Sequence, residues 1–116
     1  MIYKIRSLKT SFLIILLFSS LLSSNEIIVI DVRSFEEVKT GVIQDAIHIE
    51  WTKIEEEITN LDISKEQPIY LYCRSGNRSG KATKILEKIG YTNAINAGGI
   101  TEAAKKLDKK IVKYSE

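Results

Sequence analysis

The chain of 116 residues contains only one cysteine, one histidine and one proline. A single cysteine excludes an intramolecular disulfide, and one cysteine with one histidine provides too few ligands for a zinc site, so no metal or other cofactor is expected. The sequence contains no internal repeat and no low-complexity linker. With 44% hydrophobic residues, this length suits one modest core and is too short for two domains.

The N-terminus has the order of segments found in a secretory signal. Basic residues come first, an apolar stretch follows, and small polar residues end it: Lys4, Arg6 and Lys9, then Phe12 to Leu22, then Ser23 and Ser24. The apolar stretch is short for a membrane span. We therefore predict a signal peptide over residues 1–24, with an uncleaved anchor as the alternative, and a periplasmic domain over residues 25–116.

Removal of residues 1–24 changes the charge balance of the chain. The remaining domain has 14 basic residues against 15 acidic ones, so nucleic-acid binding loses its electrostatic basis. We expect a monomer with no membrane contact unless the leader is retained. The lysines between Lys105 and Lys113 alternate with apolar residues up to Val112, which predicts the solvated face of a final helix.

Short apolar segments alternate with helical patterns along residues 25–116. The expected strands are 27–32, 46–49, 69–72 and 94–96, and the expected helices are 34–39, 51–61, about 79–89 and one that begins after Gly98 and Gly99. This alternation predicts an α/β fold with a mostly parallel sheet flanked by helices. In such sheets, sites lie beyond the carboxyl ends of the strands, where both Cys73 and the segment Asp31 to Arg33 are expected.

Cys73 stands where an apolar strand ends and the loop CRSGNRSG begins, directly before an amphipathic helix. Gly76 allows the backbone to curl, so the amides of residues 74 to 79 can converge on one point at a helix N-terminus, with Ser79 expected as the helix cap. We therefore predict a reactive thiolate on an anionic substrate and do not expect Cys73 to be buried in an apolar core. Helix N-termini and nearby arginines can lower a thiol pKa from about 8.5 to roughly 3.5–7.5.

Six residues of this loop are candidate substrate-binding residues. They are Arg74, Ser75, Gly76, Asn77, Arg78 and Ser79. The planar guanidinium groups of the two arginines suit an oxyanion such as a sulfonate or a phosphate. Together with Cys73, they predict nucleophilic sulfur chemistry on a small anion.

Three segments resemble the rhodanese-like sulfurtransferases. They are IDVRSFEEVKTGVIQDAIHI, YLYCRSGNRSGKA and GYTNAINAGGI, and the similarity covers residues 26 to 107. Among family members, the chain looks most like the small, exported thiosulfate sulfurtransferases with one domain. The resemblance implies a single rhodanese-like domain in which Cys73 takes a sulfane sulfur from a donor such as thiosulfate, becomes a persulfide and passes the sulfur to cyanide or another thiophilic acceptor.

The same loop also fits other functions. A persulfide carrier or sulfide-binding module without turnover is the main alternative. A cysteine phosphatase or arsenate reductase is less favoured, because only four residues separate Cys73 from Arg78, one fewer than the phosphatase loop has. Turnover of thiosulfate and cyanide would separate the enzyme from the carrier.

The resemblance also suggests roles for residues outside the loop. Asp31 and Arg33 match signature residues that mainly support the architecture. The segment from Val42 to Asp45 departs from the family pattern of His, Ile, Pro and Gly, but aspartate tolerates the left-handed backbone that glycine would supply.

His48 lies in a predicted strand, remote in sequence from the loop, and is expected to be packed or at the surface rather than a catalytic base. Trp51 stands at the start of a predicted helix and is expected to belong to the core.

Overall fold

A computed structural model of the protein describes residues 26–115. The predicted signal peptide lies outside the described residues. The central sheet has four parallel strands in the order β3-β1-β4-β5. These strands are β1 (Ile28–Asp31), β3 (Ile47–His48), β4 (Ile69–Cys73) and β5 (Ala94–Gly99). The prediction of a mostly parallel sheet is confirmed.

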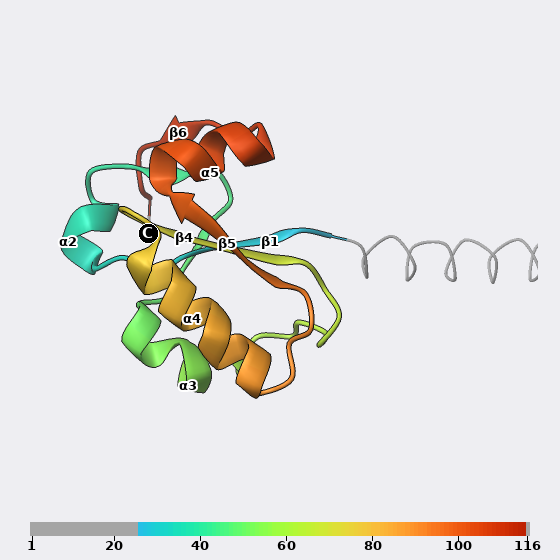
Figure 1. Ribbon diagram of the computed structural model, residues 1–116. Helices are drawn as coiled ribbons and strands as arrows, with labels where there is room; N and C mark the ends of the chain where they lie inside the picture. Colours follow the sequence, from blue (N-terminus) through green and yellow to red (C-terminus); the bar gives the residue numbers. More distant parts are fainter. Residues whose placement is uncertain (1–25, 116) are drawn as a thin grey trace, which may run out of the picture.

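Helices cover both faces of this sheet (Figure 1). On one face lie the 3-10 turn η1 (Trp51–Lys53) and the helices α3 (Ile54–Ile58) and α4 (Asn77–Lys88). On the other face lies α5 (Ile100–Leu107). The short helix α2 (Phe35–Val38) follows β1. The chain therefore forms three layers, with the β4 strand in the interior.

Strand β4 contributes side chains to both cores because successive residues of a strand face opposite sides. Leu71 and Cys73 pack in the cluster that α3 and α4 cover, whereas Tyr72 packs in the cluster beneath α5. Helix α4 follows its predicted pattern: Ala82 and Leu86 are fully buried. Gly90 follows this helix with a φ of 102°, as expected of a glycine at a helix C-terminus.

Apart from the start of α4, three expected elements differ from the structure by more than one residue at an end. The predicted helix over 51–61 is divided into η1 and α3. The strand expected at 94–96 continues through Gly98 and Gly99, with a register shift opposite Leu71 and Tyr72. The final helix ends at Leu107, because Asp108 adopts a left-handed conformation with φ 51°.

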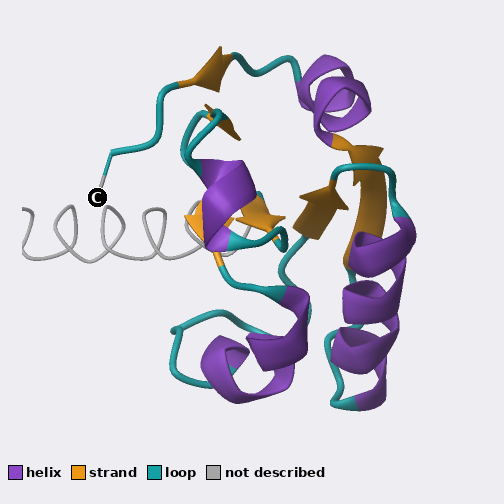
Figure 2. Ribbon diagram, turned by 90° about the vertical axis from the view of Figure 1, so that its left-hand side faces the viewer, coloured by secondary structure: helices purple, strands orange, loops and turns teal. Residues whose placement is uncertain are grey.

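The prediction that a helix continues to Val112 is therefore wrong. Ile111–Val112 instead form strand β6, which pairs antiparallel with β2 (Val42–Ile43). This two-stranded sheet lies apart from the central sheet (Figure 2). Asp45 follows β2 with φ 69°, which confirms that an aspartate takes the left-handed position in this turn.

Candidate active site around Cys73

Cys73 is the last residue of β4, and its side chain points toward α4 as part of the core cluster. It has no exposed surface. The expectation that this side chain would not be buried is therefore wrong. The reason is its position on a central strand, on the same face as Leu71, beneath the start of α4.

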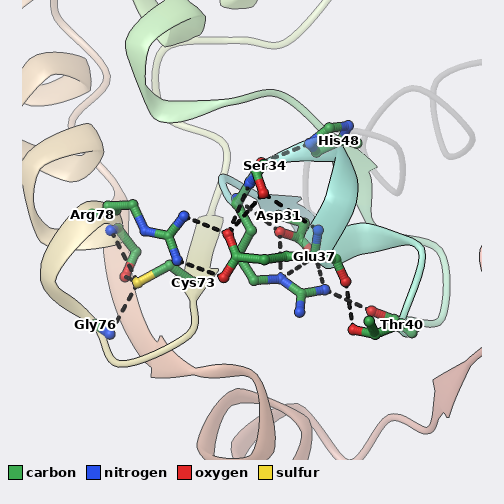
Figure 3. Close-up of polar contacts among 11 residues, drawn as sticks. Asp31, Ser34, Glu37, Thr40, His48, Cys73, Gly76 and Arg78 are labelled. Atoms are coloured by element: carbon green, nitrogen blue, oxygen red, sulfur yellow. Dashed lines mark hydrogen bonds and ion pairs between the residues drawn. The ribbon is translucent and has the colours of Figure 1, made fainter.

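Polar donors nevertheless surround the sulfur within this buried position. The backbone N–H of Gly76 lies 3.0 Å from Sγ, and the N–H of Ser79 lies 3.4 Å away. The hydroxyl of Ser79 is 3.3 Å from Sγ. Gly76 has φ 97°, a left-handed conformation that turns its amide back toward the sulfur. Figure 3 shows the loop curling around Cys73 in this way.

Two opposing effects act on the ionisation of Cys73. Burial raises the pKa of the thiol, whereas hydrogen bonds from the Ser79 side chain and from the backbone of Ser79, Ser75 and Gly76 lower it. The hydrogen bonds dominate, so the pKa of Cys73 lies below its usual value. The site therefore stabilises a thiolate although it excludes water.

The start of α4 differs from the sequence-based prediction. The helix begins at Asn77 and Gly76 occupies the N-cap position, so Ser79 is not the cap. Ser79 is fully buried in the first turn and contacts the sulfur directly. Beginning the helix two residues earlier brings the first amides of α4 close to Sγ.

Arg78 forms an ion pair with Glu37 rather than standing free in the loop. Its two terminal nitrogens donate to the two carboxylate oxygens at 2.6 and 2.8 Å (Figure 3). Glu37 also accepts from the backbone and hydroxyl of Ser34, which caps α2. The Arg78 guanidinium lowers the pKa of Glu37 to about 2. This pair joins α2 to α4 beside the sulfur.

A cavity of about 460 Å³ lies beside the loop. Its lining contains basic and acidic side chains, one neutral polar residue and one apolar residue: Arg33, Glu36, Glu37, Thr40, Arg74 and Ile100. Arg74 is exposed. The cavity thus offers a cation one residue away from Cys73 in the chain.

This geometry agrees with the comparisons to known proteins. A family model described as the rhodanese-like domain matches residues 17–106. The chain belongs to the rhodanese family. The match spans most of the sequence and includes the Cys73 loop.

Relatives of this rhodanese domain include two bacterial proteins. The chain is 37% identical over 75 residues to thiosulfate sulfurtransferase PspE of Escherichia coli, a match that covers 65% of this chain and 72% of that protein. It is 39% identical over 79 residues to putative sulfurtransferase YtwF of Bacillus subtilis, with 67% and 74% covered.

A solved structure shows the same fold. A rhodanese with anions from E. coli superposes with a TM-score of 0.70 at 34% identity, covering 77% of this chain and all of that one. Family, relatives and fold agree that the chain is a sulfurtransferase.

Asp31 and Arg33 of this rhodanese domain form a buried ion pair at the end of β1 (Figure 3). Arg33 donates to both oxygens of Asp31 at 2.7 to 3.1 Å and to the carbonyl of Gly41 at 2.6 Å. The pair therefore ties the end of β1 to the segment before β2. Arg33 also lines the cavity beside the loop.

The other loop residues and the two aromatic candidates have distinct positions. The side chains of Ser75 and Asn77 are exposed, and the sulfur is contacted by the loop backbone and Ser79. A ring nitrogen of His48 lies 2.8 Å from the carbonyl of Arg33, in a half-buried position. Trp51 packs against the core, as expected.

Two residues that contribute to the site were missed at the level of sequence. Glu37 stands three residues after Ser34, a spacing that indicates a capping box, but nothing in the sequence pairs it with Arg78. Asn96 contacts both Ser79 and the loop carbonyl of Gly76. Its position in a short strand gave no signal of this role.

Proposed function

We propose that the protein is a thiosulfate sulfurtransferase that carries sulfane sulfur on Cys73. The Cys73 thiolate attacks the outer sulfur of thiosulfate, the sulfur–sulfur bond of the donor breaks, and sulfite leaves with the electron pair. Cyanide or another thiophilic acceptor then attacks the outer sulfur of the persulfide. Thiocyanate forms in the case of cyanide, and the Cys73 thiolate returns.

The observation that supports this proposal is the convergence of donors on one sulfur atom. The N–H groups of Gly76 and Ser79 lie 3.0 and 3.4 Å from Sγ, and the hydroxyl of Ser79 lies 3.3 Å away, where it can turn toward an anionic sulfur. Such donors stabilise an anionic sulfur without the need for a general base. The relative from E. coli bears the name thiosulfate sulfurtransferase, which supports thiosulfate as the donor.

The cavity beside the loop provides a place for the donor. Arg74 lines it, whereas the guanidinium of Arg78 is occupied by Glu37. We propose that Arg74 binds the sulfonate end of thiosulfate and that Arg78 maintains the loop together with Glu37. Since Cys73 has no exposed surface, the donor reaches the sulfur only when neighbouring atoms move.

Steady-state turnover tests the reaction. The purified protein should convert thiosulfate and cyanide to thiocyanate and sulfite over many cycles, and Cys73→Ser should be inactive. Transfer of a single sulfur equivalent without further cycles would instead identify a persulfide carrier. Release of phosphate from an aryl phosphate at a similar rate would favour the phosphatase alternative.

We also propose that the protein is an exported monomer, with residues 1–24 as its signal. The support is the order of basic, apolar and small polar residues at the N-terminus. Within residues 26–115, no helix has the length and apolar character required to span a bilayer. Recovery of a shortened, monomeric chain from the periplasm would support the proposal, and a full-length chain in the membrane fraction would contradict it.

A further inference from the structure

Asn96 on β5 has an amide whose orientation is determined by two backbone groups. The N–H of Gly98 donates to Oδ1 at 3.0 Å, and Nδ2 donates to the carbonyl of Gly76 at 3.0 Å. A backbone N–H cannot accept and a carbonyl cannot donate, so the two ends of the amide cannot be exchanged. The oxygen of Asn96 therefore faces Ser79.

This orientation determines the direction of the Ser79 hydroxyl. The Oγ of Ser79 lies 2.7 Å from Oδ1 of Asn96 and 3.3 Å from Sγ of Cys73. An amide oxygen only accepts, so the short contact requires Ser79 to donate to Asn96. A hydroxyl has one hydrogen, and Ser79 cannot donate it to the sulfur at the same time.

We propose that Asn96 is a positioning residue that controls, through the hydroxyl of Ser79, whether Cys73 carries its proton. While Ser79 donates to Asn96, its lone pairs face the sulfur and accept the S–H of the neutral thiol. When the thiol loses its proton to solvent, the hydroxyl hydrogen turns from Oδ1 to the sulfur anion. The other hydrogen bonds of Asn96 do not change, and Oδ1 still accepts a hydrogen bond from the N–H of Gly98.

Ser79 is the residue through which this effect acts because it is fully buried. Its hydroxyl has two neighbours in the structure, Asn96 and Cys73. Asn96 itself is exposed, so its amide oxygen has to be replaced by an apolar group that still covers the buried hydroxyl of Ser79. The sulfur is then the remaining acceptor for the hydrogen. The hydrogen bond to an anionic sulfur is then gained without the loss of another.

Charged groups around Cys73 come from other elements. Arg78 on α4 is paired with Glu37 on α2, and Asp31 is paired with Arg33 at the end of β1. Arg74 lies next to Cys73 in the chain and is exposed. The side-chain hydrogen bonds of Asn96 are to Gly76, Ser79 and Gly98. A change at Asn96 thus leaves these charged partners in place.

The test is a pH titration of the thiolate by its ultraviolet absorbance, with Cys73→Ser as the blank. Since Cys73 is the only cysteine, the signal has one source. Leucine is similar in size to asparagine and, at this exposed position, removes the acceptor next to the fully buried Ser79, so the thiol pKa should fall by about one unit in Asn96→Leu. Asn93→Leu is the matched control, because Asn93 contacts Glu66 and should leave the thiol pKa unchanged.

Two further variants separate this effect from general loosening of the loop. Asn96→Asp retains an acceptor for Ser79 and adds a negative charge, so the thiol pKa should rise. In the Ser79→Ala background, Asn96→Leu should leave the thiol pKa unchanged. An equal shift with and without the Ser79 hydroxyl, or no fall in Asn96→Leu alone, would overturn the inference.

The functional meaning of this inference rests on the proposed role of Cys73, but its test does not. The titration measures proton binding in the absence of any sulfur donor. Failure of the proposed function would appear as a protein that does not turn over thiosulfate, whatever the pKa of Cys73. Failure of the inference would appear as a thiol that does not respond to Asn96.

Discussion

Two residues of the site, Cys73 and Arg78, interact with partners from distant parts of the sequence or from the backbone of the loop. The sulfur accepts from the amides of Gly76 and Ser79, and the guanidinium of Arg78 is bound by Glu37, 41 residues earlier in the chain. These contacts assign different roles to the loop backbone and to Arg78, which the sequence alone does not distinguish. The loop backbone stabilises the anion, and the arginine joins two helices.

The Glu37–Arg78 pair predicts a pH dependence of stability. The folded pKa of Glu37 is about 2, below the ordinary 4.5, so its stabilising contribution is complete above pH 4.5 and is lost as the pH falls toward 2. Glu37→Gln should reduce the free energy of unfolding by about 1 kcal/mol at neutral pH. The difference from wild type should disappear toward pH 2 in chemical denaturation curves.

Glu36→Gln is the matched control for this measurement. The Glu36 side chain is 81% exposed and lies 3.5 Å from Lys39, so its removal should change the stability little. In Glu37→Gln, the glutamine at position 37 can still complete the capping box with Ser34. That variant therefore removes the charge of Glu37 and keeps the helix cap. Equal effects of the two substitutions at neutral pH would contradict the importance of the Arg78 pair.

The different surroundings of the two loop arginines predict different kinetics. Arg74→Ala should raise KM for thiosulfate about tenfold, the loss of roughly one charge-assisted hydrogen bond. It should have little effect on KM for an uncharged organic trisulfide. Arg78→Ala should affect both donors alike, because it acts through the loop. A larger selective effect for Arg78→Ala would show that Arg78 is the cation that binds the donor.

The elements differ in how far local sequence determines them. The period of apolar residues predicts α4 because its face toward the sheet repeats with each turn, and Ser34 with Glu37 predicts the start of α2. Strand β6 could not be predicted in this way. Apolar residues and lysines near the C-terminus fit a helix equally well, and the pairing of Ile111 with Ile43 depends on a distant segment.

In the site, too, some features follow from the local sequence and others depend on distant segments. The loop could be predicted because strand, glycine and helix follow one another directly in the sequence. The burial of Cys73 depends on which face of β4 meets α4, and the contact of Ser79 with Asn96 depends on the alignment of β5. Neither is encoded by residue spacing within the loop.

The turn from β4 into α4 predicts that Gly76 is needed for reactivity as well as stability. A Cβ at Gly76 would lie 3.3 Å from the Cα of Gly98, and φ is 97°. Gly76→Ala should cost about 1–2 kcal/mol in unfolding free energy. It should also slow the reaction of Cys73 with thiosulfate about tenfold, through loss of the amide contact to sulfur.

Gly90→Ala provides the control at the other end of α4. Gly90 has a similar φ of 102°, with the side chain of Lys65 as its neighbour. It should lose comparable stability without any change in the reaction of Cys73. If the Gly76 variant reacted as fast as the Gly90 variant, the curled loop would not be required for sulfur chemistry.

For the molecule as a whole, the parallel sheet places Cys73 and its supporting residues at the carboxyl ends of the strands. Strands β1 and β4 are neighbours and run in the same direction, so the Asp31–Arg33 pair and Cys73 lie at the same edge. Helix α2 follows β1 there and contributes Glu37 to Arg78. The fold therefore assembles the site from segments that are separate in the sequence.

Intact mass spectrometry of the whole protein tests the central claim most directly. After exposure to thiosulfate, the wild-type chain should gain the mass of one sulfur atom and lose it again when cyanide is added, whereas Cys73→Ser should gain nothing. A wild-type chain whose mass does not change, or a gain that remains in Cys73→Ser, would contradict sulfur transfer through Cys73.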